Sequence, residues 1–143
     1  MSDTSGMSNM SDKALVSDLV PTLRYNDAAA AIKFLQDAFG MTSVMVVPGD
    51  NDTVAHAELT FGNSMIMLGT NLPEGCGDQL RWPVGGSSVY GIVDDVDAHC
   101  ARAVAAGATV VLAPKDEDYG GRGYTVRDPE GNLWSFGSYR PRV

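Results

Sequence analysis

Two polar residues, His56 and Glu58, stand two positions apart in the segment 53–61, in which apolar and polar side chains alternate. This alternation predicts a β-strand, so both side chains point to one face of a sheet. A histidine beside a carboxylate suits proton transfer or the anchoring of a polar ligand group. The alternative is a polar face satisfied by neighbouring strands or by a partner subunit, because such side chains need not touch.

Other candidate ligand-binding residues flank this pair in the predicted sheet and in the loops. Arg24 and Thr22 share one face of a predicted strand over 18–25, and a guanidinium there suits a carboxylate, phosphate or sulfonate; an ion pair with Glu58 is equally compatible. Trp82 and Tyr90 could stack on a planar ligand, although Trp82 could also close a dimer or domain edge.

The second half of the chain contains further candidate ligand-binding residues. Arg122 and Tyr124 follow the glycine-rich stretch 119–121, which could close over a ligand or only form a turn or bulge. Residues 115–121 are expected to form a charged loop. Trp134 and Phe136 alternate with polar neighbours and are expected to pack beneath the second helix, whereas His99 is expected to face solvent on that helix.

These residues lie on a unit that occurs twice, around residues 20–69 and 88–137. Each copy reads as a strand, an amphipathic helix, a short strand and a strand pair, with helices expected over 27–39 and from 94 or 95 to 106. The helix residues expected to face inward are Ala28, Ile32, Leu35 and Phe39 in the first copy and Val96, Cys100, Ala103 and Val104 in the second.

The repeat predicts an α+β fold of two tandem βαβββ modules, about 18–70 and 87–140, joined by a loop over 71–86. We expect a curled mixed sheet around a concave cleft, with the helices outside. Glycine follows each helix, as Gly40 and Gly107. Gly62 and Gly131, each followed by asparagine, are predicted to hold equivalent turn positions of positive φ.

Composition limits the classes of function. The 143 residues are 44% hydrophobic, which suits one domain over 16–143. A formal charge of −8, without a basic stripe, argues against a nucleic-acid partner. Residues 1–15 read as a disordered tail without a secretory signal, and no apolar run suits a membrane span. Two cysteines without metal-like spacing indicate a cytoplasmic protein with free thiols.

Three stretches resemble the vicinal oxygen chelate superfamily, which includes glyoxalase I, extradiol dioxygenases and bleomycin-resistance proteins. They are LRYNDAAAAIKFLQDAFGM, HAELTFGNSMIMLG and GGRGYTVRDPEGNLWSFGSY, and the resemblance covers about residues 18–140. The DPEGN turn before an aromatic strand is the most specific piece. The second stretch resembles the PhnB-like and antibiotic-resistance branches. The resemblance implies the βαβββ pair and leaves the chemistry open.

In the metalloenzymes that this chain resembles, the ligands come from the first and last strand of each module. Those positions fall here on Val20, on Ile66 or Met67, on Ser88 and on Ser135. Aliphatic side chains and neutral hydroxyls cannot replace the three or four donors that a divalent ion needs. We therefore expect neither the usual metal site nor another cofactor.

The resemblance and the residues together favour a non-enzymatic protein of the bleomycin-resistance type. It would be a homodimer that sequesters a small, planar or cationic organic molecule, such as an antibiotic, in two equivalent clefts; its acidic charge would attract a cation. The predicted cleft residues are Thr22, Arg24, His56, Glu58, Met67, Trp82, Ser88, Tyr90, Arg122, Tyr124 and Ser135.

Two enzymatic functions remain as alternatives. One is a metal-dependent lyase, isomerase or dioxygenase with a displaced metal site built on His56 and Glu58. The other is metal-free acid or base catalysis by the same two residues.

Overall fold

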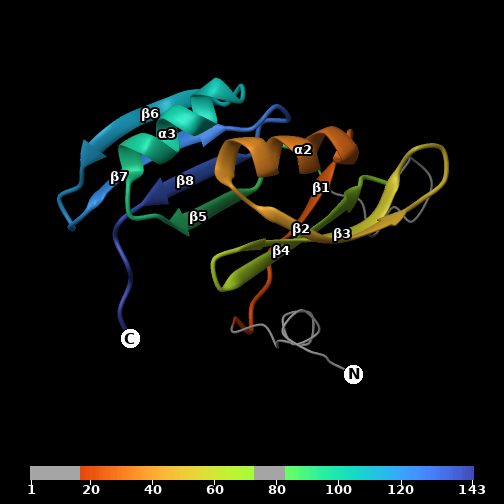
Figure 1. Cartoon of the computed structure of the whole chain (residues 1–143), viewed down its shortest axis with the longest axis horizontal. Coiled ribbons are helices and arrows are strands. Elements are labelled where there is room, and N and C mark those ends of the chain that lie inside the picture. The colour runs from red at the N-terminus through yellow and green to blue at the C-terminus, as the bar shows by residue number, and fades with distance from the viewer. Residues whose placement is uncertain (1–16, 73–82) are drawn as a thin grey trace, which may run out of the picture.

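The computed structural model describes residues 17–72 and 83–143, and within them the predicted repeat is present as two modules (Figure 1). The first contains β1 (Thr22–Tyr25), α2 (Ala28–Phe39), β2 (Thr42–Pro48), β3 (Val54–Phe61) and β4 (Ser64–Thr70). The second contains β5 (Ser88–Ile92), α3 (Val96–Ala105), β6 (Thr109–Asp116), β7 (Arg122–Arg127) and β8 (Leu133–Gly137). The predicted α+β class and the two βαβββ units are confirmed.

Each module forms a four-stranded mixed sheet of its own. Sheet A has the order β1-β4-β3-β2 and sheet B the order β5-β8-β7-β6. In both, the first strand pairs in parallel with the last, and the other pairs are antiparallel. The helix carries the chain back across the sheet, so the second strand runs in the direction of the first; after two antiparallel turns the last strand runs in that direction too and pairs with the first in parallel.

Local sequence signals set the helix ends. Asp27 and Asp95 are the N-caps, and each side chain accepts a hydrogen bond from the backbone N–H three residues on, at 3.1 Å. Gly40 ends α2 with φ of 80°, a left-handed conformation that glycine adopts at little cost. The predicted positive φ angles of Gly62 and Gly131 are confirmed, at 57° and 97°.

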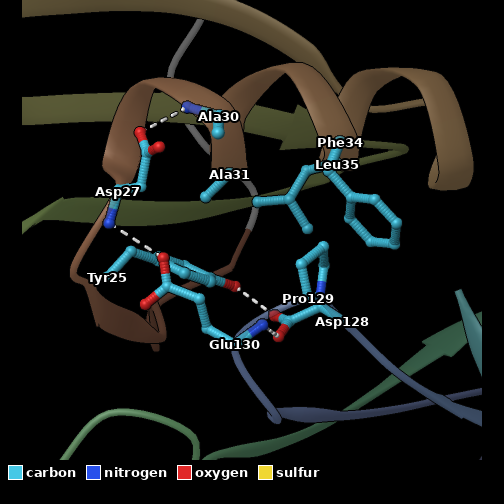
Figure 2. A pocket seen from close by; sticks show the side chains of 9 residues that line it. All are labelled: Tyr25, Asp27, Ala30, Ala31, Phe34, Leu35, Asp128, Pro129 and Glu130. Carbon is cyan, nitrogen blue, oxygen red and sulfur yellow. Dashed lines mark hydrogen bonds between the residues drawn. The ribbon is translucent and has the colours of Figure 1, made fainter. Parts of the chain in front are cut away.

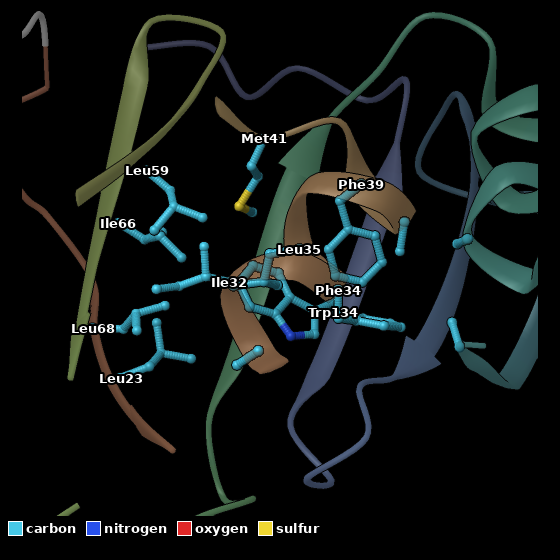
Figure 3. Packing of buried hydrophobic residues seen from close by; sticks show 14 of the residues in the cluster. Leu23, Ile32, Phe34, Leu35, Phe39, Met41, Leu59, Ile66, Leu68 and Trp134 are labelled. Atoms are coloured by element: carbon cyan, nitrogen blue, oxygen red, sulfur yellow. The ribbon is translucent and has the colours of Figure 1, made fainter. Parts of the chain in front are cut away.

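One hydrophobic core joins the modules, and α2 lies in its middle. In Figure 3, Leu23, Leu59, Ile66 and Leu68 of sheet A lie on one side of Ile32 and Leu35 of α2, and Trp134 of β8 lies on the other. The two helices also contact each other. Each sheet therefore turns its helix-side face into this core and its opposite face, called here the outward face, away from it.

The structure corrects several sequence-based boundaries and orientations. Strand β1 begins at Thr22, β8 ends at Gly137, and β6 continues to Asp116, because Lys115 and Asp116 pair with β7 instead of forming a loop. Val104 is 48% exposed, although it was expected to face inward. The buried stripe of α3 passes through Cys100 and Ala103, and the next residue points about 100° away from it.

Candidate functional site

The outward face of sheet A carries a row of four side chains across its four strands. Glu58 of β3 lies opposite Met45 of β2 and Met67 of β4, and Met67 in turn lies opposite Thr22 of β1. Residues directly opposite each other project to the same side of a sheet. The core-facing neighbours of these residues, among them Ala57 and Leu59, are fully buried.

Glu58 contacts the other candidate catalytic residue, His56, which lies in the next row of the same face. His56 Nε2 lies 2.8 Å from Glu58 Oε2, and the two side chains are 39% and 25% exposed. The carboxylate therefore fixes the orientation of the imidazole ring, and both remain open to a molecule from solvent. The pair is consequently a polar anchor at the centre of the outward face.

A pocket of about 170 Å³ opens beside this pair and brings four predicted ligand-binding residues together. It is lined by Thr22, Leu23, Arg24, Ala55, His56, Met67, Leu68 and Gly69. Arg24 Nη1 donates to the Thr70 carbonyl at 3.3 Å. A Cβ on Gly69 would stand 2.9 Å from the same nitrogen, so the missing side chain makes room for the guanidinium.

The outward face of sheet B carries the predicted residues Ser88, Tyr90 and Ser135, and the hydroxyls of Tyr90 and Ser135 already make hydrogen bonds within the chain. The hydroxyls of Ser135 and Thr125 lie 2.7 Å apart, and the Tyr90 hydroxyl donates to the Tyr139 carbonyl at 2.7 Å. Tyr90 is 41% exposed. This face is therefore polar but offers fewer open groups.

A second pocket, of about 320 Å³, opens where the modules meet. Both sheets contribute. Met65 and Tyr90 are outward-facing side chains of the lining, and core-side residues lie behind them, namely Phe61, Ile66, Val89, Trp134 and Phe136. The seam between the modules is thus the place where side chains of both repeats line one space.

Arg122 and Tyr124 do not join this site. Arg122 pairs with Asp97 at 3.0 Å and with Asp116 at 3.3 Å, so it ties β7 to α3 and β6. This pairing lowers the pKa of Asp97. Tyr124 is only 2% exposed and points into the core, so its prediction as a cleft residue is wrong. Trp82 lies outside the described residues.

The expectation that His99 faces solvent is also wrong. Its Nδ1 lies 2.6 Å from the Tyr124 hydroxyl, and its Nε2 lies 3.1 Å from the Phe39 carbonyl at the end of α2. Its ring packs against Phe136 with centroids 4.4 Å apart. Burial lowers the pKa of His99 and raises that of Tyr124. The core location predicted for Trp134 and Phe136 is confirmed, although both also contact Phe39 of α2.

The sequence reading missed a buried carboxylate, Asp128, in the turn before β8. Its Oδ2 accepts a hydrogen bond of 2.6 Å from the hydroxyl of Tyr25, which belongs to the first module (Figure 2). Asn132 Nδ2 and Trp134 Nε1 donate to the same oxygen, at 3.1 and 3.0 Å. The neighbouring Glu130 accepts the backbone N–H groups of Asn26 and Asp27 before α2. The turn therefore locks the modules together.

The same turn closes a small apolar pocket of about 200 Å³ against α2. Ala31, Phe34 and Leu35 line its helix side and Pro129 its turn side (Figure 2). The only sequence signal for this lock was the DPEGN stretch, whose turn conformation was predicted without its partners.

Comparison with known proteins identifies the family of this chain. Residues 19–136 match the family model of the Glyoxalase/Bleomycin resistance protein/Dioxygenase superfamily. The chain belongs to this superfamily. The match covers both modules and the segment between them.

Among relatives within the superfamily, an uncharacterized protein of Mycobacterium bovis is 40% identical over 123 residues, which cover 83% of this chain and 81% of the relative. An uncharacterized protein of Mycobacterium tuberculosis is also 40% identical over 123 residues, covering 83% of this chain and 72% of the relative.

Two solved structures of the superfamily fold are similar to this chain. TioX from Micromonospora sp. ML1 has a TM-score of 0.73 and 32% identity, with 87% of this chain and 99% of TioX covered. Lactoylglutathione lyase from Agrobacterium tumefaciens has a TM-score of 0.63 and 22% identity, with 85% of this chain and 92% of the lyase covered. At that identity, the second similarity shows the fold alone.

The residues do not fit the metal site that the superfamily's metalloenzymes imply. The register places Met67 on the outward face and buries Ile66, so Met67 takes the position that the sequence left open between the two. Met67 pairs with Thr22, and Ser135 pairs with Tyr90 at the equivalent place in sheet B. Over residues 17–72 and 83–143, no three His, Cys, Asp or Glu side chains gather at one point.

A displaced site on His56 and Glu58 meets the same difficulty, because the described part of the chain adds no third ligand of these types to that pair. No helix among the described residues is long and apolar enough to cross a membrane.

Proposed function

We propose that this member of the superfamily binds a small organic molecule on the outward face of sheet A and acts by sequestration, as an antibiotic-binding protein does. The observation that carries the proposal is the row Met45, Glu58 and Met67 with His56 beside it. It combines half-exposed apolar side chains with a polar anchor, the composition typical of a ligand pocket.

We further propose a homodimer, in which the outward face of sheet A is covered by a partner subunit to give two equivalent clefts. The edge strands support this. Val44, Met45, Val46 and Val47 of β2 and Val110, Val111 and Leu112 of β6 are between 42% and 54% exposed, and exposed apolar edge strands tend to be covered by another chain. The buried free thiol of Cys100 supports a cytoplasmic location.

A ligand screen on the purified full chain tests the binding function. Cationic glycopeptides, quinones, other aromatic antibiotics and non-aromatic antibiotics would be compared by thermal shift and tryptophan fluorescence. A ligand that binds only the folded state raises its stability, so at least one compound should raise Tm with saturation at one molecule per chain. If no compound of any class shifts Tm or fluorescence, sequestration is contradicted.

The 2.8 Å contact between His56 and Glu58 favours a second function, metal-free acid or base catalysis. A ligand from the screen would be incubated with wild-type protein and followed by mass spectrometry. Catalysis predicts a product that the His56→Ala variant does not form although it still binds the ligand. Recovery of the unchanged compound from wild-type protein supports sequestration instead.

A further inference from the structure

The row of three side chains on sheet A specifies more than a generic pocket. Glu58 stands between the thioethers of Met45 and Met67, on three adjacent strands. Cross-strand neighbours have Cβ atoms about 4.5 to 5.5 Å apart. The row therefore presents one polarizable sulfur on each side of one carboxylate. Its length across the three strands is about the width of a fused aromatic ring system.

Methionine at such positions favours aromatic partners. The thioether is flexible and polarizable, and it contacts ring edges and faces favourably. Met45 is 47% exposed and Met67 is partly exposed, so both side chains are accessible from the outward face.

The carboxylate supplies the polar half of the recognition. Glu58 Oε2 is occupied by His56 Nε2. Among the described residues, no hydrogen bond reaches Glu58 Oε1, which remains able to accept a further N–H. A carboxylate rejects another acceptor and favours a donor, so it discriminates between ligands that carry an N–H and those that do not.

We infer that Met45, Glu58 and Met67 bind a flat aromatic compound that carries an N–H donor at its edge. The ring lies against the two methionines, and the N–H donates to Glu58. This inference rests on the proposed ligand-binding function of the same face and names its ligand class and specificity-determining residues.

The second module shows that this arrangement does not follow from the fold alone. The row at the equivalent place in sheet B is Leu112, Thr125 and Ser135. The hydroxyls of Thr125 and Ser135 bond to each other at 2.7 Å. It therefore has neither thioethers nor a carboxylate.

A pair of matched probes tests the inference on the full chain. Norharmane is a fluorescent planar tricycle with one indole N–H, and 9-methylnorharmane differs only in carrying a methyl group on that nitrogen. Norharmane should bind wild-type protein roughly ten- to a hundredfold more tightly, as expected for a hydrogen bond to a charged acceptor. Glu58→Ala should reduce this ratio to about one, while Thr125→Ala, at the equivalent place in sheet B, should preserve it.

The methionines are tested by truncation and by the NMR signals of their labelled methyl groups. Met45→Ala and Met67→Ala should each weaken norharmane binding about two- to tenfold, and Met67→Leu by less. Val104→Ala is the control, because Val104 has nearly the same exposure, 48%, but lies on α3, away from the outward face of sheet A. Ring currents should shift the Met45 and Met67 methyl signals and leave the buried Met41 unchanged.

Three results would overturn the inference. They are equal affinity for the two probes, unshifted Met45 and Met67 signals at saturation, and no binding of either probe. None of these results contradicts the proposed binding function, because a compound without a ring or without an N–H could still bind in the broader screen. Failure of that screen with every class contradicts the proposed function itself.

Discussion

The two modules share a topology but differ in where their polar groups are used. The first exposes polar groups on the outward face, where Glu58 and His56 bond to each other and Glu58 stands between two methionines. The second turns its polar groups inward or onto one another, as in the Thr125–Ser135 pair and the buried Asp128. Under the proposed function, the first copy presents the ligand site, and the second copy supplies the turn that holds the modules together.

The turns before the last strands of the two modules also differ in their contacts. In the first module Phe61, Gly62 and Asn63 form a short turn, and Gly62 would meet no atom within 4 Å if it carried a Cβ. In the second module the longer turn buries Asp128 and reaches across to Tyr25 and to the start of α2. Of the two equivalent turns, the one in the second module is therefore the one that locks the modules together.

The largest effect should follow from breaking that lock. Asp128→Ala leaves the Tyr25 hydroxyl, Trp134 Nε1 and Asn132 Nδ2 without their buried acceptor. We expect the free energy of unfolding to fall by about 3 to 5 kcal/mol, measured by urea denaturation. Asn63→Ala, in the exposed turn of the first module, should change it little. Equal losses in both variants would contradict an asymmetric lock.

His99 gives the next largest effect, because it carries a hydrogen bond from the second helix to the end of the first. His99→Ala should cost about 2 kcal/mol through its two lost hydrogen bonds and its packing against Phe136. A loss of stability no greater than that of an exposed helix substitution would show that α3 does not hold α2 in this way.

The same histidine makes stability depend on pH. Burial lowers the folded-state pKa of His99 below its unfolded value of about 6.5, so the unfolded chain binds more protons between these two values. This contribution is present above the unfolded pKa and is lost as pH falls toward the folded pKa. Urea unfolding at about pH 7.5 and about pH 5.5 should show a smaller difference for His99→Gln than for wild type. An unchanged difference would exclude His99 as its source.

Gly69 tests the close packing around the first module's pocket. An alanine Cβ there would lie 2.9 Å from both the Ala55 carbonyl and Arg24 Nη1. Gly69→Ala should therefore lower stability by about 1 to 2 kcal/mol and displace the guanidinium. Gly86→Ala is the control, because a Cβ there meets nothing within 4 Å. If the two variants melt alike, the pocket is looser than described.

The smallest effect is expected from the hydroxyl pair of the second module. Ser135→Ala removes one partner of the 2.7 Å bond to Thr125 and should lower stability by about 0.5 to 1 kcal/mol. Ligand affinity should stay unchanged, as measured by calorimetry with a compound from the screen. A marked loss of affinity would place the ligand on sheet B as well.

The sequence predicted those parts of the fold that depend on local signals. The repeat, both helices, and the positive φ of Gly62 and Gly131 follow from periodicity and from residue types within a few positions. The outward orientation of His56 and Glu58 also follows from strand alternation. Strand ends were less accurate, because they depend on pairing with a distant strand.

The errors concern contacts between the modules. Tyr124 was placed in the cleft and His99 at the surface, because nothing near them in sequence shows that α3 packs beside the end of α2. Asp128 was read as a turn residue, although its partner Tyr25 is 103 positions away. Met45 was not singled out, because its place beside Glu58 depends on the register between β2 and β3, which contains a bulge.

The most direct test of the central claim compares equivalent positions in the two modules. Glu58 pairs with Met67 in sheet A, and Thr125 pairs with Ser135 at the same place in sheet B. The affinity of one bound compound would be measured by calorimetry for wild type, Glu58→Ala and Thr125→Ala. We predict a loss of roughly tenfold or more for Glu58→Ala and almost none for Thr125→Ala. Equal losses, or a loss confined to Thr125→Ala, would contradict the assignment of the site to the first module.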